Sequence, residues 1–116
     1  QGIVRPHGTP CHTLGALKAA PPSPWVQGHM ARINPAQVAM DAKPETVLSV
    51  LRQMKASGKG VIGMKILGAG QLRNKADESL QFVLSQNCVD CFTIGHESVA
   101  EMEDMTRKIP VASVRG

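Results

Sequence analysis

One pattern, repeated four times along the chain, does most to constrain the fold. Short apolar segments over residues 2–5, 29–33, 61–66 and 89–94 each precede a segment with helical character. Their starts lie about 30 residues apart, which is the length of a strand, a crossover helix and two loops. Strands that alternate with helices form a parallel sheet with right-handed crossovers. The sequence therefore predicts a single α/β region over residues 1–116, built from four βα units.

The expected helices follow from apolar spacing and from capping residues. The first is expected over Thr13 to Ala20, and the second begins at Pro44, a favourable first helical position, and ends at Ser57-Gly58. Asn74 is expected to cap the third helix, and Ser98 with Glu101 forms a capping box for the fourth. The residues expected on the inner helix faces are Val47, Leu48, Leu51 and Met54, then Ala76, Leu80, Val83 and Leu84, then Val99, Met102, Met105 and Ile109.

Composition narrows the classes of function. A chain of 116 residues is one domain's worth, and no apolar run approaches the roughly 20 residues of a membrane span. The net charge of +4 comes from scattered residues, and with three aromatic side chains there is no platform for stacking bases, which argues against nucleic-acid binding. Three cysteines without a disulfide framework point to a reducing compartment, so we expect a cytoplasmic protein. Because the chain begins with Gln1, we expect it to be a fragment of a longer protein.

A glycine motif and a cysteine motif have the spacing of known binding motifs, but we interpret both as structural. Gly58, Gly60 and Gly63 have the G-x-G-x-x-G spacing of a dinucleotide loop, but that loop must follow a strand and open a helix, and here the order is reversed. Gly58 is instead expected to end a helix and Gly60 to enter a strand. Cys88 and Cys91 form a C-x-x-C without a second pair, so Cys91 is expected to be a small buried hydrophobic residue within a strand.

The third strand, over residues 61–66, is nearly continuous in apolar character, which favours a parallel strand covered on both faces. Unusual polar residues follow the carboxyl ends of the strands, where both a half (β/α)8 barrel and a small open flavodoxin-like sheet place ligands. The better phosphate candidate is the segment Leu67-Gly68-Ala69-Gly70, whose alternative interpretation is an ordinary strand-to-helix turn. The polar residues concerned are His7, Cys11, His12, Asn34, Lys65, His96 and Ser98.

Four segments, in order, carry a resemblance to the aldo-keto reductases. Residues 61–72, VIGMKILGAGQL, resemble that family's seventh strand and following loop. Residues 8–13 are similar to the turn after its fifth strand, residues 32–35 to the end of its sixth, and residues 93–98 to its eighth strand and the start of the next helix. The resemblance implies strand-helix units five to eight, the C-terminal half of a TIM (β/α)8 barrel.

The resemblance further implies an oxidoreductase that reduces a carbonyl group, or oxidises an alcohol, with NADP or NAD. The family's catalytic tyrosine, aspartate, lysine and histidine come from strands two to four, which this chain does not contain, and it has no tyrosine. We therefore expect no catalytic residue here, an inactive chain when alone, and a cofactor-binding role. The residues implied for cofactor binding are Cys11, Met30, Met64, Lys65, Leu67, Gly68, Gly70, Gly95, His96 and Ser98.

The nicotinamide contacts depart from the family pattern. Pro10-Cys11 stands where the family has serine-asparagine, Met30 stands for a glutamine and Met64 for the ring-stacking tyrosine. No basic cluster follows the fourth strand to mark a 2′-phosphate, so the sequence does not separate NAD from NADP.

Two other classes of function fit parts of the sequence. His7, Cys11, His12 and His96 could ligate a metal in a barrel-type hydrolase, although no neighbouring carboxylate orients them. The lack of a tyrosine acid would also suit a non-catalytic binding domain. Because half a barrel has two open sheet edges, we expect pairing with the missing N-terminal half or self-association.

Overall fold

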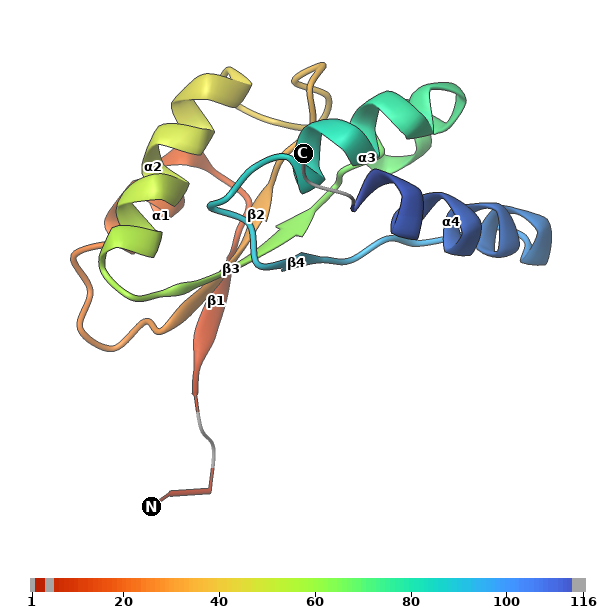
Figure 1. The fold of residues 1–116 in the computed structure, drawn as a ribbon. Helices are drawn as coiled ribbons and strands as arrows, with labels where there is room; N and C mark the ends of the chain where they lie inside the picture. Colours follow the sequence, from red (N-terminus) through yellow and green to blue (C-terminus); the bar gives the residue numbers. More distant parts are fainter. Residues whose placement is uncertain (1, 4–5, 114–116) are drawn as a thin grey trace.

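The chain folds as an α/β unit around one four-stranded, all-parallel sheet (Figure 1). The computed structural model describes residues 2–3 and 6–113. The strands are neighbours in chain order, β1-β2-β3-β4, with a helix in each connection, which confirms the predicted fold class. This order differs from the 2-1-3-4-5 order of flavodoxin-like sheets. The elements are β1 Gly8–Cys11, α1 Leu14–Ala19, β2 Gly28–Arg32, α2 Pro44–Ala56, β3 Gly60–Met64, the 3₁₀ turns η1 Gly68–Gly70 and η2 Arg73–Lys75, α3 Ala76–Leu84, β4 Cys91–Phe92 and α4 Val99–Ala112.

The first strand lies further along the chain than the sequence predicted. Of the segment 2–5, Gly2 and Ile3 are not in a strand, and residues 4 and 5 lie outside the described residues. The segment predicted as a turn forms β1, which pairs Gly8 with Gly28 and Cys11 with Ala31. Pro10 is tolerated because β1 is an edge strand. A Cβ at Gly8 would collide with the Gly28 carbonyl, so that glycine allows the two strands to approach.

The third and fourth strands are shorter than predicted. β3 ends at Met64 because Lys65 turns the backbone to a positive φ of 57°. β4 contains two residues, although its flanks still bond to β3, where Asp90 N–H donates to Val61 O and Thr93 N–H donates to Gly63 O, each at 2.9 Å.

The helix boundaries agree with the sequence where a cap is local. α2 begins at Pro44, and Gly58 follows its end with a φ of +79°. Ser98 Oγ accepts the Glu101 N–H at 3.2 Å, so the predicted cap of α4 is confirmed, although the Glu101 carboxylate accepts the N–H of Glu97 rather than that of Ser98. The cap predicted at Asn74 is wrong, because Asn74 lies within η2 and α3 begins without a side-chain cap.

Part of the predicted inner face of α4 is also wrong. Val99 is 69% exposed and Met102 is 52% exposed, whereas Met105 is buried. Only the C-terminal part of this face reaches the core, because α4 packs against α3 and its first turn extends beyond it.

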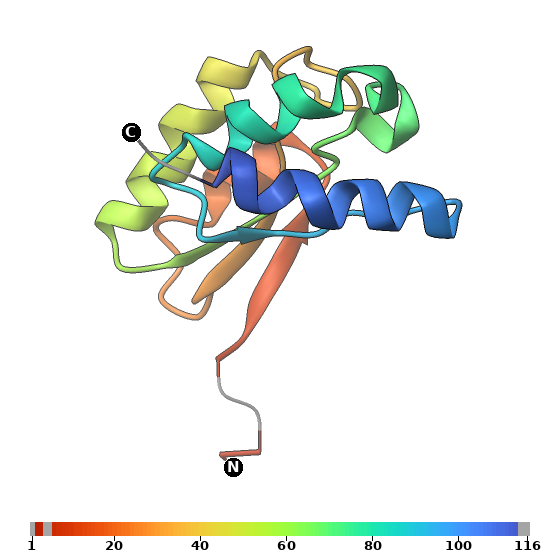
Figure 2. The ribbon, with the colours of Figure 1, turned by 45° about the vertical axis from the view of Figure 1, so that its right-hand side comes forward.

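The two faces of the sheet differ in burial. On the covered face, buried strand residues pack with α1, α2 and α3, which lie on the same side of the sheet in Figures 1 and 2. On the open face, Ile62 is 36% exposed, so the prediction that β3 is covered on both faces is wrong. Cys91 is exposed as well, against prediction, while Cys88 is buried. The covered face comprises Cys11, His29, Ala31, Val61 and Gly63, and the open face comprises Pro10, Met30, Ile62 and Cys91.

Candidate functional site

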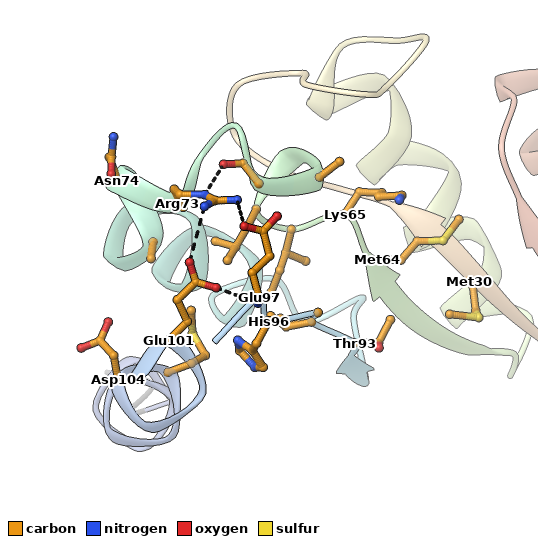
Figure 3. Close-up of a pocket in the computed structure, with 18 residues that line it drawn as sticks. Met30, Met64, Lys65, Arg73, Asn74, Thr93, His96, Glu97, Glu101 and Asp104 are labelled. Atoms are coloured by element: carbon orange, nitrogen blue, oxygen red, sulfur yellow. Dashed lines mark hydrogen bonds and ion pairs between the residues drawn. The ribbon is translucent and has the colours of Figure 1, made fainter. Parts of the chain in front are cut away.

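A cleft of about 610 Å³ opens at the carboxyl ends of β2, β3 and β4 (Figure 3). The loop after β3 forms one wall, and the segment from Thr93 to the first turns of α4 forms the other. Ligand sites of open parallel sheets and of barrels lie at this edge, and sites for small molecules are typically about 300–1,000 Å³. The residues expected from the sequence that line the cleft are Met30, Met64, Lys65, Leu67, Gly70, Gly95 and His96.

The other three expected residues do not line the cleft. Cys11 is buried on the covered face, where its Sγ lies 2.9 Å from His29 Nδ1. Gly68 is buried behind the cleft wall, and a Cβ there would come within 2.7 Å of Val38. Ser98 caps α4 at an exposed position.

The loop after β3 is a tight turn in which two backbone N–H groups donate to carbonyl groups of the same loop. Lys65, Gly68, Ala69 and Gly70 all have positive φ. Gly68 N–H donates to Lys65 O at 2.8 Å, and Gly70 N–H donates to Leu67 O at 3.0 Å. These two amides, expected from the sequence to approach a phosphate, are therefore engaged within the loop. The structure places two cationic side chains in the cleft lining, Lys65 and Arg73, which could also contact an anion.

Asn34 holds the base of this loop. Its side chain is fully buried, and its Nδ2 donates to Val38 O at 2.7 Å and to Lys65 O at 3.1 Å. Its Oδ1 accepts the N–H groups of Ala36 and Val38. Asn34 thus ties the loop after β2 to the loop after β3, and all its polar atoms serve structure.

The inner and outer ends of the cleft differ in chemistry. The inner end, against the sheet, is mainly apolar and includes Met30, Met64, Ile66 and Ile94. The outer end, between η2 and α4, is charged and is formed by Arg73, Asn74, Glu97, Glu101 and Asp104 (Figure 3).

Arg73 spans the outer end of the cleft. Its Nη2 lies 3.1 Å from Glu97 Oε2, its Nη1 lies 3.5 Å from Glu101 Oε1, and its Nε donates to Gly70 O at 3.1 Å. The guanidinium therefore links the loop after β3 to α4. Arg73, Glu97 and Glu101 were not identified as site residues from the sequence. The acidic first turn of the helix after β4 was the only local indication.

A buried cysteine-histidine pair lies on the covered face, outside the cleft. Burial raises the pKa of the Cys11 thiol, an effect that a hydrogen bond with Thr9 only partly offsets. Burial, followed by the charge of Lys59, lowers the pKa of His29. Both side chains are therefore neutral near pH 7, and the pair lacks the thiolate-imidazolium state of a reactive cysteine.

The residues considered for a metal site are used separately. The His7 ring contacts Trp25 with centroids 4.3 Å apart, and His12 Nδ1 accepts from the Arg32 guanidinium at 2.7 Å. Cys11 is hydrogen-bonded to His29, and His96 lines the cleft. Across residues 2–3 and 6–113, no group of three or more His, Cys, Asp or Glu side chains is arranged to hold a metal ion.

Comparison of the chain with protein-family models, with curated proteins and with solved structures found no match. Within the described part of the chain, no helix has the length and apolar character needed to cross a membrane. All three cysteines there are free thiols.

Proposed function

We propose that this chain is the cofactor-binding half of an NAD(P)-dependent oxidoreductase of the aldo-keto reductase type, which reduces a carbonyl group or oxidises an alcohol. The observation that carries the proposal is the cleft at the carboxyl ends of β2, β3 and β4, lined by most of the residues that the resemblance implies. An extended dinucleotide has a flat ring at each end and two phosphates between them. A cleft that is apolar at its inner end and polar at its outer end suits such a ligand.

On this proposal, the nicotinamide ring lies at the inner end, against Met30 and Met64. The thioethers supply soft, polarisable contacts in place of a stacking tyrosine. Lys65 supplies charge for the pyrophosphate, because its side chain is exposed at the cleft and no acidic partner holds it among the described residues. Arg73 is less available, since Glu97 and Glu101 already pair with it.

The open face supports the half-barrel part of the proposal. All-parallel sheets almost always have both faces covered, yet here the helices cover one. In a complete barrel the open face lies inside, and the edge strands β1 and β4 pair with further strands. We expect the missing N-terminal half, or a second copy, to complete the sheet and to bring the tyrosine, aspartate, lysine and histidine that catalysis requires.

The chain alone is therefore expected to bind NADH without reducing a carbonyl substrate. Isothermal titration calorimetry is the appropriate measurement, because Trp25 lies just before β2, at the amino ends of the strands and away from the cleft. Lys65→Met should weaken NADH binding by about tenfold, the value of one charge-assisted hydrogen bond to a phosphate.

Lys18→Met is the matched control, because it removes the same charge from an exposed position on α1, away from the cleft. The proposal fails if the folded chain releases no heat with either NADH or NADPH. It also fails if both lysine variants weaken binding equally, because that result would indicate a non-specific charge effect.

Sheet completion has a separate test, sedimentation velocity at micromolar concentration. A dimer, or a complex with the N-terminal half, is expected, and Ile62→Glu should dissociate it by placing a charge on the open face. A concentration-independent monomer would argue against the half barrel.

A further inference from the structure

The outer end of the cleft has an excess of negative side chains. Glu97, Glu101 and Asp104 all line it, whereas Arg73 is the cation among the described residues lining that end. Asp104 has partners of its own on α4, Lys108 at 3.0 Å and Arg107 at 3.8 Å. The balance that a ligand meets is therefore set mainly by one guanidinium and two carboxylates.

Arg73 is already committed to those carboxylates. Each of its three nitrogen atoms has a partner: Gly70 O, Glu97 or Glu101. A phosphate that recruited Arg73 would break both ion pairs and leave two carboxylates beside a group of about −2 charge. Like charges a few ångströms apart repel even in water, and the repulsion grows where the ligand excludes solvent.

A ribose with a free 2′-hydroxyl meets the opposite situation. A hydroxyl donates a hydrogen bond, and a carboxylate is a pure acceptor with two oxygens. An acidic side chain on the ribose 2′-hydroxyl marks NAD sites in dinucleotide-binding folds, whereas a nearby arginine accommodates the 2′-phosphate of NADP. At the outer end of this cleft, Arg73 is already paired with Glu97 and Glu101, and carboxylates outnumber cationic groups.

From this charge balance we infer that Glu97 and Glu101 make the cleft selective for NAD over NADP, by accepting from the ribose 2′-hydroxyl and repelling a 2′-phosphate. The inference rests on the proposed function, because it requires a dinucleotide whose adenosine ribose reaches the outer end. It assigns Glu97 and Glu101 a role in cofactor specificity that the sequence did not indicate.

The test compares NADH with NADPH by calorimetry on the folded 116-residue chain. NADH is expected to bind about tenfold more tightly at low salt, and the difference should shrink in about 0.5 M salt because exposed charges are then screened. In the double variant Glu97→Gln and Glu101→Gln, Arg73 is released, and NADPH should gain about tenfold and match or exceed NADH. Glutamine keeps the size of both side chains, and the side-chain oxygen at position 101 can still accept the backbone N–H of residue 97, just before α4.

Glu103→Gln is the matched control, because Glu103 is exposed on the same helix and does not line the cleft. It should leave the NADH/NADPH ratio unchanged. Tighter binding of NADPH by the unmodified chain would overturn the specificity while leaving the proposed function intact. An unchanged ratio in the double variant would overturn the role of the two glutamates. Absence of binding by both nucleotides would instead reject the proposed function.

Discussion

The two faces of the sheet use similar residue types in opposite surroundings. On the covered face Ala31 and Val61 are fully buried beneath the helices, whereas on the open face Ile62 is 36% exposed one residue away along the same strand. Successive side chains of a strand point to opposite faces, so neighbouring residues of β3 lie on a buried face and on a partly exposed face. The buried apolar contacts that stabilise the chain therefore lie mainly on one side of the sheet. The carboxyl ends of the strands remain open to a ligand, the edge strands β1 and β4 to further strands, and the open face to packing.

The largest expected contrast is between core truncations on the two sides. Leu51→Ala removes a fully buried side chain of α2 and should lower the free energy of unfolding by about 2–5 kcal/mol. Ile62→Ala removes a partly exposed side chain and should cost about 1 kcal/mol or less in dilute protein. Urea denaturation measures both values.

The same pair of variants reports on whether the open face is covered in solution. If Ile62→Ala costs as much as Leu51→Ala, and if its cost rises with protein concentration, a second copy covers Ile62. An equal cost that is independent of concentration would contradict the open face itself.

The second contrast concerns two glycines that were expected to bind the cofactor, Gly68 behind the cleft wall and Gly95 in the cleft lining. Gly68→Ala introduces a Cβ within 2.7 Å of Val38 at a φ of +58°, and should destabilise the chain by about 2–4 kcal/mol through overpacking and backbone strain. Gly95→Ala meets no atom within 4 Å and lacks a positive φ, so it should change stability by less than about 0.5 kcal/mol. Thermal unfolding measures both. A loss in Gly68→Ala as small as that in Gly95→Ala would mean that Val38 yields to the added Cβ, and that the loop after β3 is not anchored by its packing.

The sequence identified the features that depend on local spacing. Helix α2 was predicted from end to end because its apolar period, its proline start and its glycine stop all lie within the segment. β1 was misplaced because Gly8 and Pro10 have the local character of a turn. Its strand conformation comes from pairing with β2, about 20 residues further along the chain.

The residues of the candidate site also divide into those that the sequence could group and those that it could not. Lys65 and His96 could be grouped in advance, because the carboxyl ends of consecutive parallel strands meet at one edge, whereas Met30 and Met64 were expected only from the resemblance. The contact of Arg73 with Glu97 could not be predicted, because it depends on how a tight loop folds across to the start of the next helix. The engagement of the Gly68 and Gly70 amides was also hidden, since the glycine pattern suits both a phosphate cradle and a closed turn.

The smallest expected effect concerns His29, which is buried on the covered face of the sheet. The buried environment of His29, followed by the charge of Lys59, holds its pKa below the value of about 6.5 expected in the unfolded chain. The unfolded state therefore binds the proton more readily, and the stabilising contribution of neutral His29 is present above about pH 6.5 and is lost as the pH falls below it, by at most about 1.4 kcal/mol per pH unit. Melting temperatures between pH 8 and pH 5 should fall more for the unmodified chain than for His29→Gln, which cannot gain this proton. If the melting temperature of His29→Gln falls as much between pH 8 and pH 5 as that of the unmodified chain, the acid sensitivity arises outside the covered face.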